Sequence, residues 1–199
     1  MQLLGFSINF IKIMATSKSI IICGRSGAGK GTVCKYLIEK TDGIIYQLSS
    51  ISRKILQEFD IPETRESFSK ISSLIRSLFG ENIFAEMAVK FRRENTKNII
   101  IFDGVRRKNV IHTLKEEGNC IVIFIDTKTP IRYERIIKRG EKHNEASLGF
   151  EEFLEEEKLK SEVEIDSIKD IADIVIENNG TEQELKQQLD TLFNEFYQK

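Results

Sequence analysis

The chain has 199 residues, of which 40% are hydrophobic and 31% charged, with 12 glycines and only 2 prolines. This length and composition predict one compact domain with a full hydrophobic core, and they exclude a disordered chain, a collagen-like chain and a disulfide-rich scaffold. The three cysteines, Cys23, Cys34 and Cys120, are far apart and belong to no CxxC or Cys/His cluster, so neither a zinc site nor a disulfide network is expected. We therefore expect reduced thiols in a cytoplasmic protein.

Charge is distributed unevenly along the chain, although the net charge is only −1. Residues 1–140 contain 24 Lys and Arg against 14 Asp and Glu, whereas residues 141–199 contain 6 against 17 and no arginine. An acidic third beside a basic region argues against general nucleic-acid binding. The distribution instead predicts a basic pocket for a small anionic molecule.

The first thirteen residues are apolar, but they are too short to span a membrane and lack the basic segment and cleavage site of a signal peptide. Residues 1–17 are therefore either a dispensable N-terminal extension or an extra strand or helix that covers a sheet edge. The sequence leaves both interpretations open, and neither implies a membrane as partner.

Five short apolar runs, each rich in Ile or Val, follow along the chain. They are Ser19–Cys23, Ile44–Leu48, Asn98–Phe102, Cys120–Ile125 and Asp173–Ile176. Nearly continuous apolar runs of this length are typical of strands buried on both faces of a parallel sheet. With helical segments between them, the runs predict a doubly wound α/β fold with a five-stranded parallel sheet.

Helical spacing of apolar residues appears between these runs. Two such segments, 68–78 and 84–91, are separated by Gly80 and predict two extra helices between the second and third strands. A third segment, 110–114, precedes Gly118, and Thr129-Pro130 begins a further helix. The acidic segment 150–157 is predicted to be a solvated amphipathic helix.

The most informative motif directly follows the first apolar run and opens a helix. It reads G-R-S-G-A-G-K-G-T, and its predicted nucleotide-binding residues are Gly24, Arg25, Ser26, Gly27, Ala28, Gly29, Lys30, Gly31 and Thr32. Glycines allow the backbone to curl around a phosphate chain, the helix N-terminus adds a positive dipole, and the lysine adds a charge at the β- and γ-phosphates. The alternative, a glycine-rich turn without a ligand, does not need this strand-loop-helix context. The Arg25 side chain is expected either over the nucleotide or in water.

This GxxGxGKGT form resembles the phosphate loop of P-loop nucleoside monophosphate kinases such as adenylate kinase. Four further segments resemble the same superfamily, so that the resemblance covers residues 18–199. Leu48–Arg53 resembles the segment whose terminal arginine grips the acceptor phosphate, and Asp103–Arg107 resembles its DGxxR segment. Arg135 and Arg139 match its RxxxR pattern. Finally, Ala172–Gly180 resembles a segment of dephospho-CoA kinases and of an archaeal group of nucleotide-kinase-like proteins.

The resemblance implies a single P-loop kinase domain over residues 18–199, with a helical acceptor-binding insertion at 49–97 and a lid at 140–160. It implies ATP and Mg²⁺ as cofactors. The catalytic residues that it implies are Lys30, Arg53, Asp103, Arg106, Arg107, Arg135 and Arg139, with Thr32 and Asp103 at the metal and with Arg135, Asn178 and Gly180 at the nucleotide. The sequence departs from the usual P-loop because Gly31 replaces the Mg²⁺-binding hydroxyl, which moves to Thr32.

The function expected from this resemblance is phosphoryl transfer from ATP to a small nucleotide-like acceptor, a nucleoside or deoxynucleoside monophosphate. A hydroxyl acceptor usually needs a carboxylate as base after the second strand, yet no acidic residue lies between Asp42 and Glu58. Two alternatives remain: a dephospho-CoA-kinase-like enzyme that phosphorylates a hydroxyl, and a regulatory nucleotide-binding ATPase without a small acceptor. The oligomeric state is not predicted.

Overall fold

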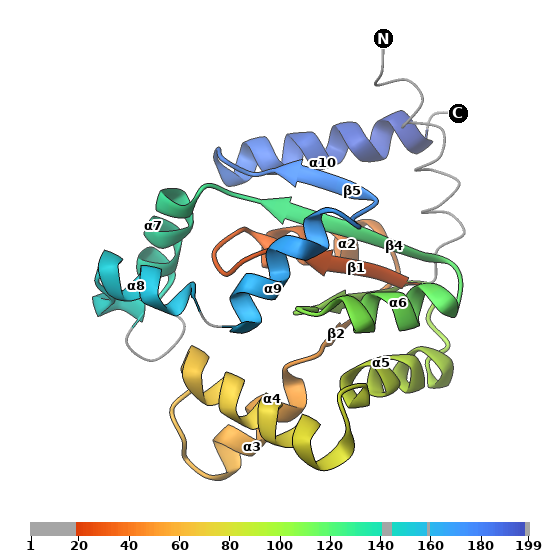
Figure 1. Ribbon diagram of the computed structural model, residues 1–199. Helices are drawn as coiled ribbons and strands as arrows, with labels where there is room; N and C mark the ends of the chain where they lie inside the picture. Colours follow the sequence, from red (N-terminus) through yellow and green to blue (C-terminus); the bar gives the residue numbers. More distant parts are fainter. Residues whose placement is uncertain (1–18, 141–144, 159, 198–199) are drawn as a thin grey trace.

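The protein is organised around one parallel β-sheet, seen in the computed structural model in Figure 1. The structure describes residues 19–140, 145–158 and 160–197, so the expected extension 1–17 lies outside the described residues. The strands are β1 (Ser19–Cys23), β2 (Ile44–Gln47), β3 (Ile100–Asp103), β4 (Cys120–Asp126) and β5 (Ile174–Glu177). They are all parallel and lie in the order β2-β3-β1-β4-β5. The predicted five-stranded α/β fold is confirmed.

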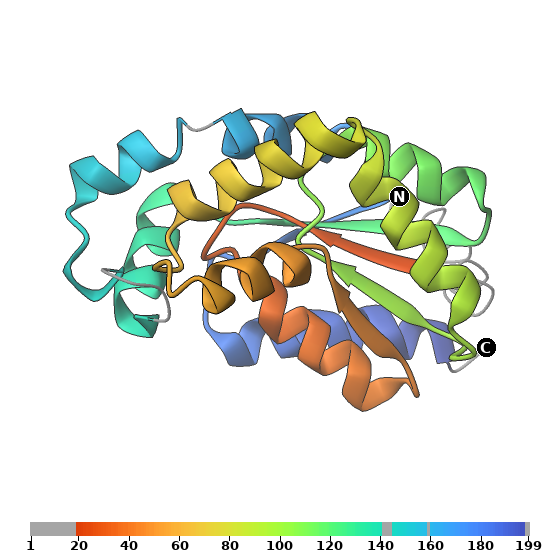
Figure 2. The same ribbon diagram turned by 90° about the horizontal axis from the view of Figure 1, so that it is seen from below.

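Helices cover both faces of this sheet, as Figure 2 shows. One face packs on α2 (Lys30–Lys40) and α10 (Glu182–Tyr197), and the other on α5 (Ile83–Glu94), α6 (Lys108–Glu116) and α9 (Lys160–Lys169). Successive residues of a strand point to opposite faces, so Ile20 and Ile22 belong to one core and Ile21 and Cys23 to the other. Two cores explain the continuous apolar runs. None of the helices in the described part of the chain is long and apolar enough to cross a membrane.

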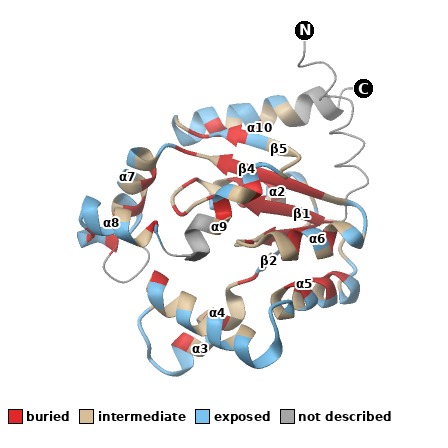
Figure 3. Ribbon diagram, viewed as in Figure 1, coloured by how far each residue is buried: buried red, intermediate tan, exposed pale blue. Residues whose placement is uncertain are grey.

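The insertion between β2 and β3 contains three helices rather than the two expected. The additional one is α3 (Ser50–Glu58), which precedes α4 (Arg65–Phe79) and α5. Helix α3 is short and rich in serine and charged residues, so it was not predicted from the sequence. The start of α4 has a clearer signal, since the Thr64 side chain accepts a hydrogen bond from the Ser67 backbone N–H at 3.0 Å. Much of α3 and α4 is exposed or half-buried (Figure 3).

The segment between β4 and β5 also contains more elements than expected. It comprises α7 (Thr129–Arg139), a 3₁₀ turn at Glu145–Ser147, α8 (Phe150–Glu156) and α9. Pro130 lies in the first turn of α7, a position that proline favours. Gly140 ends the helix in a left-handed conformation at φ +55°, as glycine commonly does. The amphipathic helix predicted at 150–157 is present as α8, with Glu151, Glu152 and Glu155 exposed and Phe153 completely buried against Ile136 and Leu148 in a small separate core. Glu157, just after the helix, is buried rather than solvated.

Candidate active site

The glycine-rich loop connects the carboxyl end of β1 to the N-terminus of α2. Three of its glycines have positive φ angles, +139° at Gly24, +76° at Gly27 and +99° at Gly29. A Cβ atom at Gly27 would lie 2.6 Å from the Arg132 carbonyl oxygen, so only glycine fits there. This tight backbone turn leaves the first N–H groups of α2 directed toward the carboxyl edge of the sheet, as phosphate binding requires.

The underside of this loop is held by residues from distant parts of the chain. The Ala28 carbonyl accepts hydrogen bonds from the Asn178 side-chain amide at 2.8 Å and from the Thr127 hydroxyl at 3.1 Å. Arg132 donates to the Ser26 carbonyl at 3.3 Å. Asn178 was predicted to contact the nucleotide, but the structure places its buried side chain beneath the loop, where it fixes the loop's shape.

Arg25 points away from the other loop residues. Its guanidinium lies 2.7 Å from Glu157 and 2.7 Å from Asp166, and its hydrogen bond is the main cause that lowers the pKa of the Asp166 carboxyl. Its backbone carbonyl accepts a hydrogen bond from the Lys30 ammonium at 3.0 Å. The Arg25 side chain is 18% exposed and held by these two carboxylates, so it does not lie in water, while its position over the nucleotide stays a prediction.

Beside the loop lies a cleft of about 850 Å³ that extends from α2 to the insertion. The predicted site residues that line it are Ser26, Gly27, Gly29, Lys30, Gly31, Thr32, Arg53, Asp103, Arg106, Arg107, Arg135 and Arg139. The predicted residues that do not line it are Gly24, Arg25, Ala28, Asn178 and Gly180. One cleft therefore joins the phosphate loop to the arginines expected at the acceptor.

On the insertion side of the cleft, Arg53 is held in a defined position. Its Nε lies 3.0 Å from a Glu63 carboxylate oxygen, its Nη1 donates to the Gln47 side chain at 3.0 Å, and the guanidinium stacks 5.5 Å from the centre of the Phe68 ring. A guanidinium fixed in this way needs little further ordering to bind a phosphate.

On the opposite side, the three arginines of α7 have different surroundings. Arg135 donates to the backbone carbonyls of Asn178, at 3.1 Å, and Gly180, and burial lowers its pKa. Arg139 pairs with Glu145 at 2.9 Å. Arg132, three residues before Arg135, is buried and donates to Thr127, Ser26 and Glu157. Only Arg135 and Arg139 line the cleft.

Asp103 ends β3 beside the phosphate loop, since β1 and β3 pair with Ile22 opposite Asp103. Its Oδ1 atom is buried and has no hydrogen-bond partner among the described residues. The same residues contain no group of three or more His, Cys, Asp or Glu side chains able to hold a metal. A single carboxylate beside a phosphate loop fits Mg²⁺, which is usually bound by one or two carboxylates together with substrate phosphates and waters. Thr32 lines the same cleft and offers a hydroxyl.

Two arginines of α4, Arg65 and Arg76, also line the cleft, and neither was predicted from the sequence. The helix itself is confirmed, but Leu74 and Leu78 of its apolar spacing are 53% and 66% exposed. The signal that could have identified the cleft face is the spacing of Phe68, Ser72 and Arg76, four residues apart, which places them on one side of a helix.

Glu157 is a third residue that was not predicted from the sequence. Three guanidiniums surround its carboxylate: Arg132 at 2.6 Å, Arg25 at 2.7 Å and Arg65 at 3.2 Å. We call these four residues the Glu157 cluster. It joins the phosphate loop, α7 and α4 through a single buried carboxylate.

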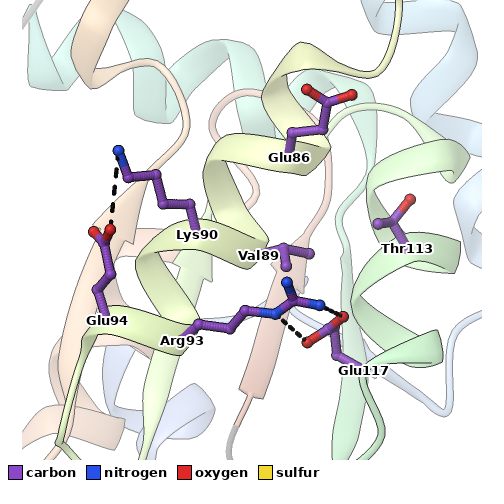
Figure 4. Close-up of a pocket in the computed structure, with 7 residues that line it drawn as sticks. All are labelled: Glu86, Val89, Lys90, Arg93, Glu94, Thr113 and Glu117. Carbon is purple, nitrogen blue, oxygen red and sulfur yellow. Dashed lines mark hydrogen bonds and ion pairs between the residues drawn. The ribbon is translucent and has the colours of Figure 1, made fainter.

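A second hollow, of about 400 Å³, lies between α5 and α6 (Figure 4). Four of its charged side chains form ion pairs with each other, Arg93 with Glu117 at 2.6 Å and Lys90 with Glu94 at 3.9 Å. None of the residues assigned to the phosphate loop or to its cleft lines it.

Comparison with known protein families identifies relatives over most of the chain. A family model described as an AAA domain matches residues 20–160. A UPF0200 protein of Sulfurisphaera tokodaii is 30% identical over 179 residues, which cover 90% of this chain and 97% of that protein. A UPF0200 protein of Thermococcus kodakarensis is 28% identical over 185 residues, with 90% and 98% covered.

Solved structures of small-molecule kinases share the fold. Shikimate kinase from Bacteroides thetaiotaomicron superposes with a TM-score of 0.56 at 15% identity, covering 88% of this chain and 98% of that one. A gluconokinase from Sinorhizobium meliloti superposes with a TM-score of 0.52 at 16% identity, covering 90% and 93%. These similarities establish a P-loop kinase fold.

Proposed function

We propose a function for this chain from its family: it belongs to the UPF0200 family and to the AAA domain family of P-loop NTPases. The proposed function is transfer of the γ-phosphoryl group of ATP to a nucleoside or deoxynucleoside monophosphate. The observation that carries this proposal is the single cleft lined both by the phosphate loop and by arginines of the insertion and of the β3–α6 connection. A protein that only hydrolysed one nucleotide would not need the second set of cations.

The residues of the cleft match the needs of phosphoryl transfer, in which catalysis rests on positioning and on positive charge around the transferred group. Lys30 and the N-terminus of α2 hold the donor phosphates, and Arg135 and Arg139 approach them from α7. Asp103 would hold Mg²⁺, which when bound neutralises charge on the β- and γ-phosphates. Residues 140–160 would close over the donor, although residues 141–144 and 159 lie outside the described part of the chain.

The acceptor phosphate is assigned to Arg53 and Arg106. An oxygen of this phosphate forms the new bond to the γ-phosphorus, and the bond between the γ-phosphorus and the bridging oxygen breaks, with its electron pair leaving on ADP. No proton has to be removed, because the attacking oxygen is already anionic at neutral pH. The acidic residues lining the cleft are Glu39, Asp103 and Glu182, none of them from the β2–α3 segment where a base for a hydroxyl acceptor was sought.

The proposal is tested by measuring ATP consumption with a panel of monophosphates, deoxynucleoside monophosphates and dephospho-CoA. We expect one or more monophosphates to stimulate consumption and to be converted to diphosphates. Arg53→Ala should raise the acceptor KM or lower kcat by about tenfold or more, because it removes a charge-assisted hydrogen bond, and should leave the KM for ATP nearly unchanged.

Arg93→Ala is the matched control, since Arg93 is an exposed arginine of α5 that pairs with Glu117 away from the cleft (Figure 4). ATP hydrolysis that no acceptor stimulates would support the regulatory ATPase instead. Phosphorylation of dephospho-CoA, with every monophosphate inert, would show that the acceptor is a hydroxyl and would make Asp103 the first candidate for its base.

A further inference from the structure

The cleft contains a second pair of arginines besides those assigned to the transferred phosphate. Arg76 of α4 and Arg107 of the β3–α6 connection both line the cleft. A carboxylate oxygen of Glu81 lies 2.8 Å from Arg107 Nη1 and 3.8 Å from Arg76 Nε, so the two guanidiniums share one anionic oxygen. The Arg76 guanidinium also lies 5.8 Å from the centre of the Phe84 ring.

The positive charge of Arg76 is compensated less closely than that of Arg107. The Arg76 side chain is only 13% exposed, whereas Glu81 is 70% exposed and closer to Arg107. Burying a guanidinium without a close anion is unfavourable, because water that solvated it has been removed. Burial, and then the charge of Arg107, lower the pKa of Arg76 accordingly. Arg107 has a further carboxylate, Glu164, at 3.3 Å, so Arg76 is the member of the pair with the weaker compensation.

Arg53 and the Arg76–Arg107 pair lie near opposite ends of α4. Arg53 is anchored by Glu63 and by the Phe68 ring, at the beginning of the helix. Arg76 is anchored by Ser73, Glu81 and Phe84, at and beyond its end. Phe68 and Arg76 are eight residues apart, which corresponds to about 12 Å at 1.5 Å per residue. One phosphate group cannot be held by both ends.

We propose that the acceptor carries a second anionic group of the phosphate type, bound by Arg76 and Arg107 at the end of the cleft opposite Arg53. The inference rests on the proposed function, which supplies the first phosphate. Two guanidiniums provide the forked donors that phosphate oxygens accept, and the Phe84 ring limits the water around them. Among the 5′-nucleotides that can serve as acceptors, the preferred one is therefore a nucleotide with a second phosphate, such as a nucleoside 3′,5′-bisphosphate.

The test compares the binding of matched 5′-monophosphates and 3′,5′-bisphosphates by titration calorimetry at constant ionic strength. We expect the wild-type protein to bind the bisphosphate of at least one base about tenfold more tightly, as an added charge-assisted contact implies. Arg76→Gln should remove most of this advantage and leave monophosphate binding within about twofold of wild type, whereas Arg76→Lys should keep part of it. Arg93→Gln should keep all of it.

Equal affinity for the two ligands in the wild-type protein, or an advantage that persists in Arg76→Gln, would overturn the inference. Thermal melting of each variant controls for misfolding, and Arg107→Gln serves as a second variant of the same subsite. Because binding is measured without turnover, the two proposals fail separately. An Arg76-dependent preference without any phosphoryl transfer would refute the proposed function and support the second anion subsite.

Discussion

The Glu157 cluster makes a quantitative prediction about stability. Glu157→Gln keeps the size of the side chain but removes the charge that faces Arg132, Arg25 and Arg65 at 2.6, 2.7 and 3.2 Å. Breaking a buried ion pair by removing one partner costs about 3–5 kcal/mol, because the remaining charge stays buried without compensation. Arg25 keeps Asp166 and Arg65 keeps Glu156, so the lower value, about 3 kcal/mol, is expected.

For a chain of this length, each kcal/mol corresponds to about 2–4 °C in melting temperature, so Glu157→Gln should lower the Tm by about 6–12 °C. The assay is thermal unfolding followed by circular dichroism, with urea unfolding as an independent measure of the free energy. Glu155→Gln is the matched control, because Glu155 lies in the last turn of α8, two residues before Glu157, is exposed and pairs only with Lys158 among the described residues. Its Tm should change by less than about 2 °C.

A Glu157→Gln protein that melted within 2 °C of the wild type would refute the reasoning, since the cluster would then contribute no more than a surface pair. A second readout separates the cluster from general packing. Arg25 belongs to the phosphate loop, so Glu157→Gln should also weaken ATP binding, and Glu155→Gln should not.

Three further predictions concern the phosphate loop and the core. Lys30→Ala should lower kcat by a factor on the order of 10² or more with an unchanged Tm, because it removes charge from the transferred phosphate without removing packing. Asn178→Ala should lower stability by about 1–3 kcal/mol and weaken ATP binding, since it removes a hydrogen bond to the buried Ala28 carbonyl. Burial raises the pKa of the Cys23, Cys34 and Cys120 thiols to about 12. Above a pH of about 8.5, thiols of the unfolded chain lose protons and those of the native protein do not. The free energy of unfolding should therefore fall with rising pH, by about 1.4 kcal/mol per pH unit for each thiol.

Each of these predictions has a measurement that could contradict it. Wild-type turnover in Lys30→Ala would remove the loop from the active site. Asn179→Ala is the control for Asn178→Ala, because the Asn179 side chain accepts only the Lys128 backbone N–H among the described contacts. Equal losses of stability and ATP binding in the two variants would exclude a specific role of Asn178 in supporting the loop. Urea midpoints that do not fall between pH 8 and pH 10, or rapid labelling of native thiols at pH 8, would contradict the burial of the cysteines.

The sheet and the phosphate loop could be predicted from the sequence because their signals are local. A strand buried on both faces is a continuous apolar run, and the loop requires glycines and a lysine at fixed spacing between a strand and a helix. Asp103 and Arg53 were predicted as site residues because each follows a strand, and both line the cleft.

The remaining features depend on contacts between distant segments, which periodicity does not record. Helix α3 has Ile51, Ile55 and Leu56 at helical spacing, but its 9 residues are too few for this pattern to stand out. Helix α4 exposes Leu74 and Leu78 because its cleft side is occupied by Phe68 and Arg76. Glu157 is 132 residues from Arg25 in the chain. Within a run of glutamates, nothing local distinguishes the one that becomes buried.

The hydrogen bond between Asn178 and Ala28 joins residues 150 positions apart. Asn178 directly follows β5, the strand at the edge of the sheet and the last to be synthesised. A growing chain can therefore form β1, β3 and β4 and expose the glycine-rich segment to the cell's nucleotides well before that segment has its final support. Tight nucleotide binding should arise late in translation, and a ribosome-bound chain that ends before β5 should bind ATP less well than the released protein.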